Sequence, residues 1–134
     1  MRTVESNKKY TVKVFPEDKI VTHQMHGFVE GDDFKAMFRA GRDAYIKHNC
    51  TAWLSDDSLN PMVNQEDLIW AQAEWEPQIL EAGWKYWALV VPEKIFGKMA
   101  MRAIIQRYKE KGVTVEVFKS YEDGLAWLKA QNQS

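Results

Sequence analysis

Apolar and polar residues alternate in two short segments near the start of the chain, and the pattern then changes to helical spacing. Residues 10–15 and 20–26 are typical of strands, and residues 16–19 between them favour a tight turn. From Gly31 to about His48, apolar residues recur every three or four positions, as on the buried side of a helix. The pattern therefore predicts an antiparallel hairpin followed by one helix.

Three further strand–helix pairs are predicted between residues 50 and 130. Strands are expected at residues 51–54, 84–91 and 113–118, each followed by an amphipathic helix. The second strand is apolar at nearly every position, as in a parallel strand covered on both faces, whereas Glu116 makes the third partly polar, which suits a sheet edge. The predicted order β-β-α-β-α-β-α-β-α indicates an α/β fold with an open mixed sheet.

Two of the predicted helices have unusual sequences. The first, with Asn64 as its expected N-cap, contains Pro77, which removes a backbone hydrogen bond and clashes with the carbonyl four residues back. We therefore expect a kink near residues 72–75, or two abutting helices. The next helix, expected over residues 93–111, is apolar on more than one side, as in a helix that is deeply buried or contacts something beyond its own sheet.

Composition narrows the class of protein. The 134 residues, of which 46% are hydrophobic and 28% charged, fit one globular domain spanning residues 1–134. The net charge of -1 gives no reason to expect nucleic acid as a partner. Cys50 is the only cysteine, and the chain has neither a signal-like apolar stretch at its start nor an apolar run long enough for a membrane span. We expect a cytoplasmic protein.

No set of catalytic, cofactor-binding or metal-binding residues is recognisable. His23 and His26 are three residues apart on a predicted strand and so face opposite sides, and Cys50 suits a small buried apolar position. Asp56 and Asp57 follow a central strand at the edge where open α/β sheets place their sites, but the other strand ends supply no further carboxylates. We expect no enzyme, no cofactor and no metal.

The chain has more large apolar side chains than one sheet is expected to cover. Six tryptophans occur in 134 residues, and Trp84 and Trp87 are expected on opposite sides of their strand. Such an excess indicates a protein contact or a ligand pocket. The candidate interface or ligand residues are Phe96, Met99, Met101, Ile105, Tyr108, Asp56, Asp57 and Trp75.

Several segments, together with the element order, resemble the STAS/SpoIIAA-like domains of bacteria, especially their small stand-alone members. These segments are Gln65-Glu66-Asp67, Glu74-Trp75-Glu76-Pro77, Gly83, Ala88-Leu89-Val90-Val91-Pro92, Phe96-Gly97-Lys98-Met99 and Ala126-Trp127-Leu128. The resemblance covers nearly the whole chain and implies a SpoIIAA-like sheet. In the anti-sigma antagonists of this group, a strand ends in Asp, and an Asp-Ser pair follows eight and nine positions later, where the serine is phosphorylated.

Counting from Asp56 places Asn64 and Gln65 at that pair. Gln65 has no hydroxyl, so the resemblance implies that the phosphoserine switch is absent. Ser55 and Ser58 are nearby alternatives, although serines beside Asp and Asn are usually turn residues.

Two functions remain open at this point. The first is a non-catalytic regulatory or protein-interaction module that forms homo-oligomers, with contacts through the helix after Pro92 and the loop at residues 56–63. The alternative is a carrier or sensor of a small apolar or lipid-like ligand, because the resemblance implies that some members of the wider superfamily are related in shape to lipid-binding domains. Its pocket would lie under the kinked helix near Trp75 and Pro77 and be lined by tryptophan and methionine.

Overall fold

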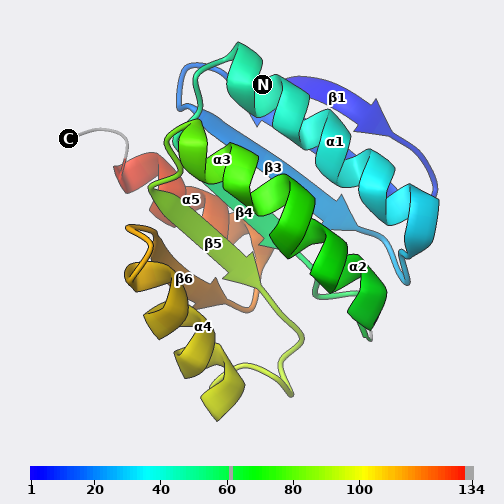
Figure 1. Ribbon diagram of the computed structural model, residues 1–134, viewed down its shortest axis with the longest axis vertical. Coiled ribbons are helices and arrows are strands. Elements are labelled where there is room, and N and C mark those ends of the chain that lie inside the picture. Colours follow the sequence, from blue (N-terminus) through cyan, green and yellow to red (C-terminus); the bar gives the residue numbers. More distant parts are fainter. Residues whose placement is uncertain (61, 132–134) are drawn as a thin grey trace.

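A six-stranded mixed sheet with helices on both faces forms the core of the computed structural model, which describes residues 1–60 and 62–131 (Figure 1). The strands are β1 (Arg2–Ser6), β2 (Tyr10–Phe15), β3 (Ile20–Met25), β4 (Ala52–Asp56), β5 (Tyr86–Val90) and β6 (Thr114–Phe118). The helices are α1 (Gly31–Lys47), α2 (Gln65–Trp70), the π-helix η1 (Ala71–Trp75), α3 (Glu76–Glu81), α4 (Met99–Lys109) and α5 (Tyr121–Gln131). Pro61, in the loop expected at residues 56–63, and residues 132–134 of the expected domain lie outside the described residues.

The strands lie in the sheet in the order in which they occur along the chain. β1, β2 and β3 are antiparallel neighbours, whereas β3 to β6 are parallel. The parallel pairs are connected through α1, through the continuous α2–η1–α3 segment and through α4, as parallel strands require. The predicted α/β class is therefore confirmed, and the carboxyl ends of β3, β4, β5 and β6 meet at one edge of the sheet.

The sequence pattern missed strand β1. All five of its residues are exposed, so the segment has no apolar alternation to predict a strand. It pairs with β2 at the edge of the sheet, with an irregular register between Thr3 and Glu5. The expected N-terminal hairpin is thus part of a three-stranded antiparallel unit. At the opposite edge lies β6, as the polar Glu116 predicted.

The two faces of the sheet bury separate apolar clusters. The larger cluster lies under α1, η1, α3 and α4, and the smaller one lies under α5 (Figure 1). At the centre of the larger cluster, the fully buried Trp53 ring stacks on Phe38 with centroids 5.9 Å apart and meets the edge of Trp75 at 4.8 Å. Gly41 of α1 leaves room for this ring, because a Cβ atom there would lie 2.3 Å from Trp53 Cη2.

The helix that contains Pro77 is irregular where a kink was expected, but it is neither simply kinked nor divided into two helices. Instead of a simple kink, residues Ala71–Trp75 form a π-helical turn in which the Glu76 N–H donates to the carbonyl of Ala71, five residues back. The chain then continues as α3 with Pro77 in its first turn, where proline has no N–H to donate to the preceding helical turn. The predicted cap is confirmed, since Asn64 Oδ1 accepts from the backbone N–H groups of Glu66 and Asp67.

Two other local predictions are wrong. The helix expected over residues 93–111 begins at Met99, because Gly97 has a φ of +85°, which no right-handed helix can contain. Trp84 and Trp87 lie on the same face, with ring centroids 5.2 Å apart. Trp84 precedes β5, so strand alternation does not apply to it.

Candidate functional site

A cavity of about 600 Å³ lies at the carboxyl ends of the parallel strands. One wall is the α2–η1 segment, represented by Leu68, Ala71 and Trp75, and the opposite wall is α4, represented by Met101 and Tyr108. The ends of β4 and β5 lie between these two walls. Figure 1 shows the helices that form the walls, α2 and α4, as separate ribbons on the same side of the sheet. This is the edge at which open α/β sheets bind ligands, and the volume is in the range of small-molecule sites.

The cavity lining is mostly apolar and aromatic. Rings come from α1, η1, β5 and α4, and flexible methionine side chains come from the end of β3, from the loop before α2 and from α4. The residues of these two kinds include Phe38, Trp75, Trp87, Tyr108, Met62 and Met101. Methionine adapts its shape to a bound molecule at little cost, and aromatic rings provide large contact surfaces.

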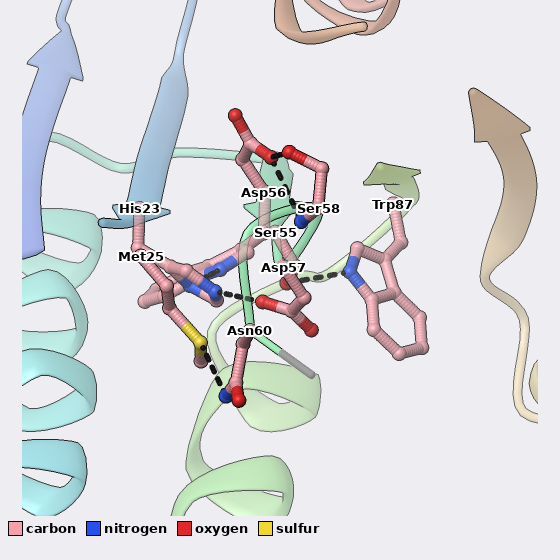
Figure 2. A network of polar contacts seen from close by, with 9 residues as sticks. His23, Met25, Ser55, Asp56, Asp57, Ser58, Asn60 and Trp87 are labelled. Atoms are coloured by element: carbon pink, nitrogen blue, oxygen red, sulfur yellow. Dashed lines mark hydrogen bonds and ion pairs between the residues drawn. The ribbon is translucent and has the colours of Figure 1, made fainter. Parts of the chain in front are cut away.

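A chain of hydrogen bonds leads from the core to the cavity. The Trp53 indole N–H donates to His23 Nδ1 over 3.1 Å, and because indole nitrogen can only donate, Nδ1 carries no proton. The proton is therefore on Nε2, which donates to Asp57 Oδ1 over 2.9 Å. His23 is fully buried, while Asp57 lines the cavity with its side chain 24% exposed. Figure 2 shows the second Asp57 oxygen directed away from His23.

Two further polar side chains hold the same region in place. Asn60 is buried and donates through Nδ2 to the sulfur of Met25 over 3.1 Å (Figure 2). Ser55 Oγ accepts from the Trp87 indole N–H over 3.0 Å, which positions that ring at the cavity. These contacts indicate a rigid polar end and an apolar body for the cavity.

A second carboxylate lines the cavity but is fully engaged. Glu76 is buried, and its two oxygens accept from the Tyr108 hydroxyl and, over 2.6 Å, from Lys111 Nζ. Burial raises the pKa of Tyr108 well above its usual range, and the hydrogen bond to Glu76 raises it further, so this phenol stays neutral and donates. The contact joins the start of α3 to the end of α4 across the cavity.

We predict that Tyr108→Phe lowers the free energy of unfolding by about 1–3 kcal/mol, because Glu76 loses a donor in a buried position. Urea denaturation measures this change. Tyr86→Phe is the matched control, since the structure gives the Tyr86 hydroxyl no hydrogen bond to any described residue, and a change within about 0.5 kcal/mol is expected there. Equal losses in the two variants would contradict the role assigned to Tyr108.

Four of the predicted candidate residues come together at this cavity. Asp57, Trp75, Met101 and Tyr108 all line it, although they come from a loop, η1 and α4. Trp75 and Tyr108 are also buried in the larger core cluster.

The other four candidates lie elsewhere. Phe96 and Ile105, with Met101, border a shallower hollow between α4 and β6, and Met99 is 82% exposed. Asp56 is the last residue of β4 rather than a loop residue, and it is buried with its Oδ1 accepting from the Ser58 hydroxyl and backbone. Asp56 and Asp57 therefore do not form one acidic site.

Sequence reasoning did not include His23, Glu76 or Leu68 among the candidates for this site. A histidine within a strand and a glutamate on a helix carry no signal of burial by themselves. Only the fold brings His23 into contact with the cavity-lining Asp57 and brings Glu76 to the cavity. Leu68, on the first turn of α2, is 39% exposed and lines the cavity.

The other histidine, cysteine and serine side chains considered from the sequence lie outside the cavity or are hydrogen-bonded within the protein. His26 is exposed and contacts Thr11, on the other side of the strand from His23. Burial raises the pKa of Cys50 to about 12, so its thiol is neutral at physiological pH. Ser55 is buried, and the Ser58 hydroxyl donates to Asp56. Across residues 1–60 and 62–131, no three His, Cys, Asp or Glu side chains are arranged to hold a metal ion.

Comparisons with known proteins add no family assignment. No family model, no curated protein and no solved structure matches this chain significantly. Within the described residues, no helix has the length and apolar character needed to cross a membrane.

Proposed function

We propose that this protein binds a small, largely apolar molecule in the cavity between α2–η1 and α4, as a carrier or a sensor. The observation that carries the proposal is the cavity of about 600 Å³ with its mainly apolar and aromatic lining. In a chain of 134 residues, a hollow of this size leaves apolar side chains without packing partners, which lowers stability. A ligand that fills the hollow offsets that cost.

The cavity has an opening suited to an apolar ligand. Met62 and Leu68 both line it, and they are 72% and 39% exposed. Large apolar side chains that stand partly in water at the edge of a cavity are typical of ligand-binding grooves. A ligand entering past Met62 and Leu68 passes from water to the aromatic wall formed by Trp75.

Hydrogen bonds connect the helices at one end of the cavity. Glu76 on α3 and Tyr108 on α4 are hydrogen-bonded, and Lys111 adds a third contact at the same carboxylate. These contacts fix α4 relative to α3 at one end of the cavity, while the π-helical turn shapes the facing wall. Short π-helical turns within an α-helix are frequent at functional sites.

Isothermal titration calorimetry with 2-(1-naphthyl)ethanol, a neutral molecule with an aromatic body, tests this proposal. We expect saturable binding with one molecule per chain at two temperatures and a negative heat-capacity change, because apolar surface is buried. Absence of saturable binding at both temperatures would overturn the proposal.

We also propose that the fold is of the STAS/SpoIIAA-like type. Four consecutive parallel strands with intervening helices, and an antiparallel unit at one edge, support this assignment. The absence of a hydroxyl at Gln65 supports a member without the phosphoserine switch.

Self-association is the second candidate function, and exposed side chains at the start of α4 favour it. Met99 is 82% exposed and Phe96 is 40% exposed, next to the hollow between α4 and β6. We expect light scattering to give a dimer mass at tens of micromolar, and Met99→Lys to give the monomer. Met99 does not line the larger cavity, so this variant should bind the naphthyl probe as the wild type does. A wild-type monomer would exclude this function.

A further inference from the structure

We propose that the ligand of this cavity carries a cationic amine, which binds the free oxygen of Asp57. This inference rests on the proposed function and adds the chemical class of the ligand. Among the described residues, Asp57 is the one cavity-lining carboxylate with an oxygen that accepts no hydrogen bond.

Hydrogen bonds from the core of the protein position the Asp57 carboxylate. Trp53 donates to His23 and His23 donates to Oδ1, so a fully buried imidazole in a defined tautomer holds one oxygen. The second oxygen points away from His23 (Figure 2), and Asp57 belongs to the cavity lining. In a mostly apolar surrounding, a carboxylate oxygen needs a donor, and a charged donor forms the strongest hydrogen bond with it.

The aromatic walls favour the same ligand class. Trp75, Trp87, Phe38 and Tyr108 line the cavity, and the faces of such rings attract organic cations. The Ser55 hydroxyl fixes the Trp87 ring through its indole N–H. Carboxylate and ring faces therefore act together on a positively charged group with an apolar body.

The other charged groups at the cavity do not favour an anionic ligand. Glu76 is engaged by Tyr108 and Lys111 and so has no free oxygen to offer. Arg107 lines the cavity, but it is exposed and its guanidinium lies 5.1 Å from the centroid of the Tyr108 ring. A solvated guanidinium at the surface attracts an anion weakly, whereas the partly buried Asp57 carboxylate lies in a mostly apolar lining that strengthens its attraction for a cation.

Calorimetry at pH 7 with three molecules that share the naphthyl body tests this inference. These are 2-(1-naphthyl)ethylamine, 2-(1-naphthyl)ethanol and 1-naphthylacetate. We expect the amine to bind roughly tenfold more tightly than the alcohol, as a charge-assisted hydrogen bond predicts, and the acetate to bind most weakly.

Asp57→Asn should remove the preference for the amine over the alcohol, since the amide keeps the shape of the side chain but not its charge. Asp56→Asn is the matched control: it removes the same charge from the neighbouring residue, which does not line the cavity, and should keep the preference. Three results would overturn this inference alone. The wild-type protein could bind the alcohol as tightly as the amine, the preference for the amine could survive Asp57→Asn, or the acetate could bind more tightly than the amine. Failure of all three molecules to bind would instead overturn the proposed function.

Discussion

Replacing Trp53 by alanine should lower the free energy of unfolding by about 3–5 kcal/mol, the usual cost of truncating a fully buried tryptophan. The side chain is 0% exposed and packs against rings of α1 and η1. The truncation also leaves His23 Nδ1 without its donor in a buried position, which adds to the loss. Urea denaturation monitored by circular dichroism measures the change.

Trp70→Ala is the control for this prediction. Trp70 lies on the same side of the sheet but at the outer end of the core, where it is partly exposed and lies beside Lys35 and Arg39. Its truncation should cost less than half as much as that of Trp53, because water already contacts the ring. A larger loss for Trp70 than for Trp53 would show that the core is not centred where the structure places it.

Ala103→Trp should weaken binding of 2-(1-naphthyl)ethanol at least about tenfold, which is about 1.4 kcal/mol of binding free energy. Ala103 lies on α4, is exposed to solvent and lines the cavity. An indole at this position can occupy the hollow without displacing a buried side chain, so stability should change little. Calorimetry and urea denaturation on the same preparation separate the two effects.

Ala126→Trp is the matched control for the cavity-filling variant. Ala126 is an exposed alanine on α5, which packs on the opposite face of the sheet. We expect its affinity for the naphthyl probe to equal that of the wild type. Equal weakening in both variants would mean that the probe binds to exposed surface in general and not in the cavity.

Much of the fold could be predicted because the buried face of a strand or helix requires apolar residues at regular spacing along the sequence. The hairpin strands, α1 and the cap at Asn64 follow directly from apolar spacing and local chemistry. β1 could not be predicted in this way, since an edge strand with every side chain in water has no such period. The late start of α4 depends on the backbone angle of Gly97, which the residue type permits but does not require.

The site was predicted in part. The sequence indicated a pocket near Trp75 and Pro77 lined by tryptophan and methionine. The cavity has Trp75, Trp87 and three methionines in its lining, whereas Pro77 is not part of it. The bond between His23 and Asp57 could not be predicted, because it joins residues 34 positions apart that meet only when β3 and β4 pair. The burial of Glu76 follows from the π-helical turn, which shifts the helix face relative to a regular 3.6-residue period.

Methyl NMR of methionine provides the most direct test of ligand binding in this cavity. The chain has six methionines, of which Met25, Met62 and Met101 line the cavity and Met1, Met37 and Met99 do not. With [13C-methyl]methionine protein and 2-(1-naphthyl)ethanol, we predict saturable shifts of the Met25, Met62 and Met101 signals and unchanged signals for the other three. Shifts confined to Met1, Met37 or Met99, or no saturable shift at all, would contradict the account.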